Sequence, residues 1–192
     1  MRIISGKYKG HRLTAPKNLP VRPTTDLSKE ALFNILNHQF KFHELSVLDL
    51  FAGTGNISYE FASRGAAPVT AVDAEFKCVQ FIKATAQKFD MDLSAVKSDV
   101  YKFLEREKNT FDIIFADPPY DFSQEQFENI PTLVFNNGLL ADEGLLIIEH
   151  SAYTKMEHLP YFSSSRKYGG SVFSFFEYEI EEVTDDEDGE DE

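Results

Sequence analysis

The stretch FDIIFADPPYDF, residues 111–122, decides the fold, because it records how one buried strand ends. Residues 111–116 are almost wholly apolar, which is typical of a strand covered on both faces of a parallel sheet. The residues that follow are Asp117, Pro118, Pro119 and Tyr120. Proline cannot donate to a sheet ladder, so the strand stops there. The stretch predicts a buried strand that ends in an acid and a stiff aromatic loop.

Further apolar runs of similar length surround this strand. They are SVLDLF (46–51), PVTAVD (68–73), LSAVKS (93–98) and GLLIIEH (144–150). Helical patterns separate them, at residues 57–63, 75–89, 100–107 and 125–134. This alternation predicts an α/β fold, a parallel sheet with helices on both faces. A turn at Gly169-Gly170 then predicts an antiparallel strand after it.

The first part of the chain has a different pattern. Residues 1–23 predict a separate small hairpin with turns at Gly6 and Gly10, followed by a link with three prolines. Thr24, Thr25 and Asp26 offer caps for a helix whose apolar face lies within residues 27–36. We therefore expect a hairpin at 1–23 and the main domain at 24–180. An acidic tail at 181–192 is expected to be disordered.

Charge is distributed unevenly along the chain. Eleven of the 32 acids lie in residues 177–192, which hold no Lys or Arg, so the net charge of −13 falls to −2 without them. The first 30 residues hold seven basic side chains against two acids. Such a cluster can be an ordinary solvated surface or a phosphate-binding face. Arg2, Lys7, Lys9 and Arg12 are the candidates for RNA contact.

Several classes of protein are excluded by what the sequence lacks. No run approaches the roughly 20 apolar residues of a membrane helix. With Cys78 as the sole cysteine there is no disulfide framework, and the polar start does not resemble a secretory signal, so we expect a cytoplasmic protein. The five histidines show no metal-ligand spacing with Cys78, and no metal site is predicted. We expect a monomer without membrane contact.

The predicted site lies where the parallel strands end, because their carboxyl ends meet at one edge of the sheet. The first strand leads into a glycine-rich turn that contains Asp49, Phe51, Gly53, Gly55 and Asn56. The next strands end near Asp73, Asp99 and Asp117. An ordinary strand-to-helix turn would account for the two glycines alone. It would not account for acids at three later strand ends, so a ligand pocket is predicted.

The ligand is predicted from what the turn contains. Ser58 stands where a dinucleotide fingerprint needs its third glycine, and no P-loop motif is present. Acids around a pocket suit a cationic ligand, and Asp49 before the glycines suits an amine better than a pyrophosphate. S-adenosylmethionine, with its amine and sulfonium, is the predicted cofactor.

Asp117, Pro118, Pro119 and Tyr120 are predicted to carry the chemistry. The exocyclic amine of a nucleobase is a poor nucleophile, because its lone pair is delocalised into the ring. Acceptors at the Asp117 carboxylate and the Pro118 carbonyl can redirect that lone pair, and Tyr120 can stack on a flipped-out base. The alternative is that the tetrapeptide only caps a strand and Tyr120 packs in the core.

Three motifs make the sequence similar to a known family. RIISGKYKGHRL (2–13), RPTTDLSKEALFN (22–34) and the pair DLFAGTGN (49–56) and DPPY (117–120) resemble the RsmD family of 16S rRNA guanine-N2 methyltransferases. The likeness runs from residue 2 to about 178. It implies a class I S-adenosylmethionine-dependent methyltransferase fold, Rossmann-like, with a mixed seven-stranded sheet and an amino-terminal hairpin. It also implies methylation of one guanine in 16S rRNA, within the small ribosomal subunit or an assembly intermediate.

The resemblance carries roles onto individual residues. Those expected to hold the cofactor are Asp49, Phe51, Gly53, Gly55, Asn56, Asp73 and Asp99. Arg22, Thr24 and Thr25 are expected near the mouth of the site, with the hairpin on RNA. The chain departs from the family pattern at Ser5, where a second glycine is expected, and at Lys29, where arginine is usual. These departures concern the hairpin and one expected phosphate contact.

Two other functions stay open. A DNA adenine or cytosine amino-methyltransferase would use the same Asp117–Tyr120 chemistry, because all these targets are exocyclic amines. A non-catalytic RNA-binding factor for ribosome assembly could retain the nucleoside pocket. The residues alone do not choose guanine N2 over adenine N6, and that choice rests on the resemblance.

Overall fold

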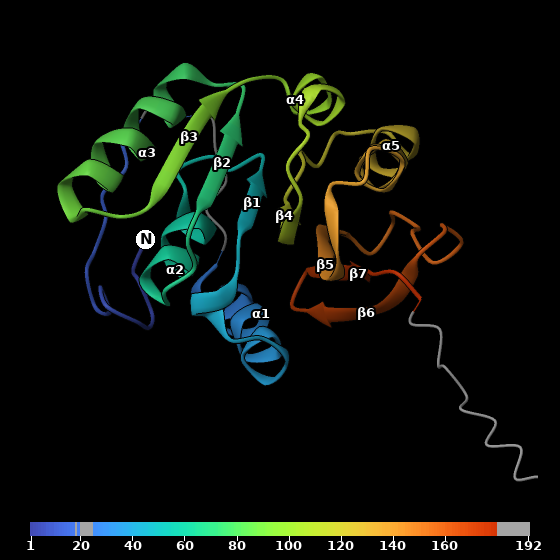
Figure 1. The fold of residues 1–192 in the computed structure, drawn as a ribbon, viewed down its shortest axis with the longest axis horizontal. Helices are drawn as coiled ribbons and strands as arrows, with labels where there is room; N and C mark the ends of the chain where they lie inside the picture. Colours follow the sequence, from blue (N-terminus) through green and yellow to red (C-terminus); the bar gives the residue numbers. More distant parts are fainter. Residues whose placement is uncertain (18, 20–24, 180–192) are drawn as a thin grey trace, which may run out of the picture.

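The computed structural model describes residues 1–17, 19 and 25–179 of the chain, which form one seven-stranded sheet and its covering helices (Figure 1). The strands are β1 (Val47–Leu50), β2 (Val69–Asp73), β3 (Leu93–Lys97), β4 (Phe111–Ala116), β5 (Leu140–Ser151), β6 (Phe162–Tyr168) and β7 (Ser171–Phe176). Their order is β3-β2-β1-β4-β5-β7-β6. The first five strands are parallel, and β7 is antiparallel to both of its neighbours. The predicted mixed seven-stranded sheet is confirmed.

The helices lie where the sequence pattern places them. They are α1 (Asp26–Gln39), α2 (Asn56–Ser63), α3 (Phe76–Phe89), α4 (Val100–Arg106) and α5 (Gln124–Asn136), with a short 3-10 helix at Phe42–Glu44. Side-chain caps explain several of the starts, because they satisfy backbone N–H groups that a helix leaves unpaired. Thr25 caps α1, Asp99 caps α4, and Ser123 caps α5 in a full capping box with Gln126.

The sheet is the middle of three layers, and alternate residues of each strand face opposite layers. In β4, Ile113 and Phe115 belong to a buried cluster that includes residues of α1, α2 and α3. Ile114 and Ala116 face the other way, into a cluster with residues of α4 and α5. Every residue from 113 to 116 is almost fully buried, which explains the unbroken apolar run of this strand.

The amino-terminal loop, which we define as residues 1–13, packs along α2 and reaches α3 (Figure 1). The predicted hairpin forms as a short antiparallel pairing, in which backbone hydrogen bonds from the Ile3 N–H to the His11 carbonyl and from the Leu13 N–H to the Met1 carbonyl, both 3.0 Å, flank a bridge between Arg2 and Arg12. Ile3, Tyr8 and Leu13 are buried in the same cluster as α1, α2 and α3. The loop fits closely because of Gly6, where an added Cβ would lie 1.9 Å from the Ser63 carbonyl oxygen. The loop therefore shares its apolar core with the main body.

Some predictions differ from the structure or lie outside it. The strand expected at 144–150 begins earlier, at Leu140, and β6 was not predicted from the residues, because it is polar and half exposed at the sheet edge. The boundary near residue 23, the sites Arg22 and Thr24, and the tail at 181–192 lie outside the described residues. The predicted division into 1–23, 24–180 and 181–192 stays a prediction.

Candidate functional site

A cavity of about 560 Å³ opens at the carboxyl ends of β1, β2 and β4. It contains ten of the eleven residues predicted to hold a cofactor or a target base: Asp49, Phe51, Gly53, Asn56, Asp73, Asp99, Asp117, Pro118, Pro119 and Tyr120. Ala52, Thr54, Ile57, Ala74, Glu75, Val100, Phe115 and Phe122 also line it. The structure thus brings the acids of four separate segments to one place.

The glycine-rich turn between β1 and α2 forms one wall of the cavity. Phe51, Gly53 and Gly55 all have positive φ, at 58°, 55° and 84°. Gly55 does not line the cavity and acts through packing instead, since a Cβ there would lie 2.8 Å from the Tyr59 ring and 2.9 Å from Ile82. The turn brings backbone, rather than bulky side chains, to the edge of the cavity.

Asp49 is the most buried acid of the site, at 1% exposure. Its Oδ2 accepts hydrogen bonds from the Ser58 backbone N–H at 3.1 Å and from the Ser58 hydroxyl at 2.5 Å. Ser58, which replaces the third glycine of a dinucleotide fingerprint, therefore holds this carboxylate in place. Burial raises the pKa of Asp49 to about 7, against the effect of the Ser58 bonds, and the charge of Asp73 adds to the rise.

Asp73 ties the second strand to the glycine-rich turn. Its Oδ2 accepts the Gly53 N–H at 2.8 Å, and its Oδ1 accepts the Glu75 N–H at 2.8 Å. Burial raises the pKa of Asp73, and these two backbone bonds oppose the rise. Each carboxylate oxygen has two lone pairs, so Asp73 can still accept bonds from a ligand's hydroxyls.

Glu75 lines the same cavity and was not among the predicted site residues. It caps α3 by accepting the Lys77 N–H at 3.2 Å. Glu75 comes two residues after Asp73, the last residue of β2, and so lies at the carboxyl edge of the sheet. That spacing is the signal by which the sequence could have indicated it.

The loop at residues 117–120 forms another wall of the cavity, at the end of β4, which is the strand beside β1. Asp117 directly follows β4, its N–H donates to the Leu50 carbonyl at 3.4 Å, and Pro118 is buried. Tyr120 is 47% exposed, which contradicts the alternative that it packs in the core. Its hydroxyl lies 3.5 Å from the Ser171 hydroxyl at the start of β7.

Phe122 anchors the far end of this loop, a role that the sequence did not indicate. Its N–H donates to the Pro119 carbonyl at 3.1 Å. Its ring packs against Phe51, Tyr101 and Phe127, with centroids 5.6, 6.4 and 6.2 Å away. The loop is therefore fixed at both ends, by the sheet and by an aromatic cluster, while Tyr120 between them stays accessible.

The four basic residues predicted to contact RNA do not lie together. The Lys7 N–H donates to the carbonyl of Ser63, at the end of α2 that is remote from the cavity. Lys9 follows Lys7 in the same exposed turn. Arg2 and Arg12, whose backbones form an antiparallel bridge, lie nearer the cavity. The Arg2 carbonyl accepts a hydrogen bond from the Lys29 ammonium, which also donates to Asn56 in the cavity wall. The structure thus separates a near pair from a far pair.

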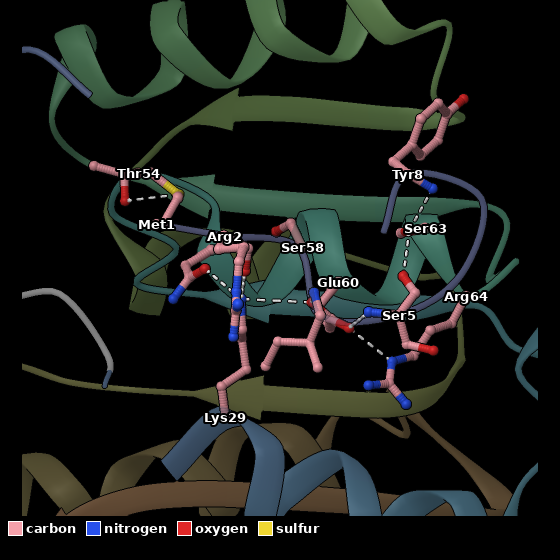
Figure 2. A network of polar contacts seen from close by, with 12 residues as sticks. Met1, Arg2, Ser5, Tyr8, Lys29, Thr54, Ser58, Glu60, Ser63 and Arg64 are labelled. Carbon is pink, nitrogen blue, oxygen red and sulfur yellow. Dashed lines mark hydrogen bonds and ion pairs between the residues drawn. The ribbon is translucent and has the colours of Figure 1, made fainter. Parts of the chain in front are cut away.

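The remaining predicted positions have structural roles where they are described. Thr25 caps α1 and accepts the Ser28 N–H at 3.2 Å. Lys29, which stands where the family pattern has arginine, has a side chain with 0% exposure and is paired with Glu60 (Figure 2). The departure at Lys29 therefore does concern a phosphate contact, because a fully buried ammonium cannot reach a phosphate on the surface.

Two properties concern the described part of the chain as a whole. None of its helices combines the length and the apolar composition needed to cross a bilayer. Within the same residues, no three side chains among His, Cys, Asp and Glu are grouped as metal ligands would be.

Comparison with known proteins places this geometry in a family. The family described as "Conserved hypothetical protein 95" matches residues 1–177. The Escherichia coli protein named Ribosomal RNA small subunit methyltransferase D is 34% identical over 161 residues, which cover 83% of this chain and 79% of that protein. The relative of that name from Buchnera aphidicola is 31% identical over 150 residues, covering 78% of this chain and 75% of the relative.

Solved structures agree on the fold. The Thermus thermophilus protein TTHA0928 superposes with a TM-score of 0.80 at 25% identity, covering 93% of this chain and 99% of its own. The 16S rRNA N2 methyltransferase RsmC of Thermus thermophilus, solved with AdoMet and guanosine, gives 0.66 at 23% identity, covering 84% of this chain and 45% of its own. The predicted class I methyltransferase fold is confirmed, and so is the predicted cofactor, S-adenosylmethionine. The chain belongs to the RsmD family of methyltransferases.

Proposed function

We propose that this protein transfers a methyl group from S-adenosylmethionine to the exocyclic N2 amine of one guanine in 16S rRNA. The observation that carries the proposal is the shared cavity. Asp117, Pro118, Pro119 and Tyr120 line the same space as the acids at the ends of the first three strands. A methyl donor and an amino base could therefore be held side by side.

The acid wall fits S-adenosylmethionine in its charge and its chemistry. Asp49, Asp73 and Asp99 provide carboxylates, Phe51, Ile57 and Val100 provide apolar surface, and all six line the cavity. The cofactor carries an amine and a sulfonium, and carboxylates stabilise such cations where water is partly excluded. When bound, S-adenosylmethionine supplies a methyl group activated by its sulfonium.

On the wall formed by residues 117–120, this chain's residues hold the amine. The Asp117 carboxylate and the Pro118 carbonyl are the proposed acceptors for its two N–H bonds, which directs the nitrogen lone pair away from the ring. The prolines and the Phe122 anchor restrict the loop, so less entropy is lost when it holds the base. The exposed ring of Tyr120 is the proposed stacking surface for a base taken out of its helix. The nitrogen's surplus proton leaves after the transfer, so no strong base is needed.

The choice of small-subunit rRNA is supported by the relatives named Ribosomal RNA small subunit methyltransferase D, whereas the choice of guanine N2 rests on the resemblance of the sequence motifs to the family. The near pair, Arg2 and Arg12, is the proposed RNA contact beside the cavity. Arg22, Thr24 and Thr25 are proposed at the mouth, although the first two lie outside the described residues. We place the reaction in the cytoplasm, on the small subunit or an assembly intermediate, with the protein acting as a monomer.

The test is to map methylated nucleotides in 16S rRNA from cells with and without the gene, and to measure radiolabel transfer in vitro. The substrates for the in vitro assay are naked 16S rRNA, small subunits and duplex DNA. One N2-methylguanine that is lost with the gene, and label in rRNA or subunits, is the expected result. Label in DNA alone, or an unchanged rRNA map together with no transfer to any substrate, would contradict the proposal.

A further inference from the structure

A buried ammonium group lies between the amino-terminal loop and α2 (Figure 2). It belongs to Lys29 of α1, whose side chain has 0% exposure. An ammonium has three N–H donors and no acceptor. The three acceptors around it are the Arg2 carbonyl at 2.6 Å, the Asn56 Oδ1 at 2.9 Å and the Glu60 Oε2 at 3.5 Å. One cation thus joins α1, α2 and the amino-terminal loop.

Glu60, the anionic partner, holds the loop to α2 over a longer stretch. Its two carboxylate oxygens accept the N–H groups of Ile4 at 2.9 Å and Ser5 at 3.0 Å. It also accepts the Arg64 Nε–H at 2.9 Å, and its side chain is fully buried. Breaking a buried, hydrogen-bonded network of this kind is costly, because the remaining charges are left without partners. The loop and α2 are therefore joined firmly.

The same ammonium fixes the orientation of the Asn56 side-chain amide at the cavity. Asn56 is the first residue of α2 and lines the cavity. Because Lys29 can only donate, Asn56 must turn its carbonyl oxygen toward it. The side chain of Asn56 can then offer only N–H donors to any other partner. Thr54, two residues earlier on the same wall, contacts the loop through the sulfur of Met1 at 3.8 Å.

We propose that Lys29 is a positioning residue for the cofactor: it holds Asn56 in a donor orientation on the cavity wall and fastens the amino-terminal loop to that wall. Occupation of the cavity and docking of the loop are then linked. The linkage is reciprocal: a docked loop raises the affinity for the cofactor, and bound cofactor stabilises the docked loop by the same free energy. Only the RNA side of this linkage rests on the proposed function, through Arg2 and Arg12 of the loop.

The first experiment needs no RNA and no activity. S-adenosylmethionine affinity is measured by calorimetry in the wild type, in Lys29→Met and in Arg64→Met, together with the melting temperature of each. Arg64→Met is the matched control, because it removes the other cation from Glu60 without touching Asn56. Both variants are expected to melt earlier. Lys29→Met is expected to weaken the affinity about tenfold or more, on the scale of typical couplings between sites, and Arg64→Met less than about twofold.

Equal loss of affinity in the two variants, or none in Lys29→Met, would overturn the proposal. If Lys29→Met does not fold, Lys29→Arg and Asn56→Ala replace it. Lys29→Arg keeps a buried donor cation and should retain affinity within about threefold of the wild type, whereas Asn56→Ala should lose about as much as expected for Lys29→Met. A folded Asn56→Ala protein with wild-type affinity would equally refute the role of Lys29.

A second measurement addresses the linkage. The affinity for S-adenosylmethionine is compared with and without saturating 16S rRNA, in the wild type and in Lys29→Met. The affinity with rRNA should exceed the affinity without it by about fivefold or more in the wild type, and this ratio should fall toward one in Lys29→Met, since the cation that joins the loop to Asn56 is absent there. A wild-type ratio of one would disprove the linkage. It would leave the proposed methylation untouched, because the methylation is judged by the rRNA map.

Discussion

The two halves of the cavity are built differently. On the cofactor side, Asp49 is 1% exposed, and both oxygens of Asp73 already accept backbone N–H groups. On the target side, Tyr120 is 47% exposed on a loop that is held at its ends. A small cationic ligand can be met by a closed, prepared wall. A base that arrives on a large RNA needs an open one, so we expect substitutions in the two halves to separate cofactor affinity from turnover.

The largest effect is expected from Asp117→Ala on the open side. Loss of a preorganised contact to the reacting amine should lower kcat by at least about 100-fold. The affinity for S-adenosylmethionine, measured by calorimetry, should stay within about threefold, because the acids of the other half are intact. Asp121→Ala, in the same loop but not lining the cavity, is the matched control. Unchanged turnover in the Asp117 variant would refute the amine-holding mechanism.

A smaller effect, about tenfold, is expected on cofactor affinity from Asp49→Asn on the closed side. The amide keeps an acceptor for Ser58 but loses the charge that attracts a cation. The wild-type affinity should also fall as the pH is lowered through about 7, where Asp49 takes up a proton, and the variant should lose this dependence. Calorimetry between pH 6 and 8.5 provides the comparison. An identical pH dependence in both proteins would exclude Asp49 as the group responsible.

The same substitution should stabilise the protein without cofactor. The pKa of Asp49 is higher in the folded chain than its usual 3.8, so the folded state holds the proton more strongly. The free energy of unfolding therefore falls as the pH rises from about 4 to 7, and Asn at this position removes that loss. Asp49→Asn should melt at a higher temperature than the wild type at pH 8 and show a smaller difference at pH 4. A lower melting temperature at pH 8 would mean that the charge is stabilising after all.

The smallest effect concerns the surface by which RNA reaches the open side. Arg2→Gln with Arg12→Gln, the near pair, should weaken 16S rRNA binding about fivefold and flatten its salt dependence, because two phosphate contacts are lost. Lys7→Gln with Lys9→Gln, the far pair, removes the same charge at the remote end of α2 and should change binding less than about twofold. Binding measured at several salt concentrations decides between them. Equal losses for the two pairs would show that the whole loop, and not its near end, contacts RNA.

The sequence predicted those helices and strands that bury one apolar face or both faces, because burial leaves a regular pattern of apolar residues. The apolar run of β4 indicated a strand buried on both faces of a parallel sheet. Because the carboxyl ends of parallel strands share one edge, the acids that follow the first three strands could be predicted to lie together. β6 escaped prediction because an edge strand does not need a buried face, and its residues are mostly half exposed. Phe122 looked like any apolar residue after a turn, and only the spatial arrangement shows that it packs on Phe51.

Lys29 shows a different limit of sequence reasoning. A lysine in a basic segment reads as a surface charge, since burial of an unpaired ammonium is costly. Its burial became possible because Glu60, in another helix, and the carbonyl of Arg2 meet it. Such a pairing depends on three segments that are distant along the chain, and no local pattern records it.

The enclosed position of Lys29 also makes it a chemical reporter. Burial lowers the pKa of its amine, although Glu60 opposes the shift, so more of the amine would be in its reactive neutral form if a reagent could reach it. An acylating reagent cannot do so while the amino-terminal loop covers the group, because the side chain has no exposed surface. The rate at which Lys29 is acylated therefore measures how often the loop lifts from α2. Bound cofactor should slow that acylation. Mass spectrometry of the acylated lysine therefore follows the motion of the loop in the protein without any substitution.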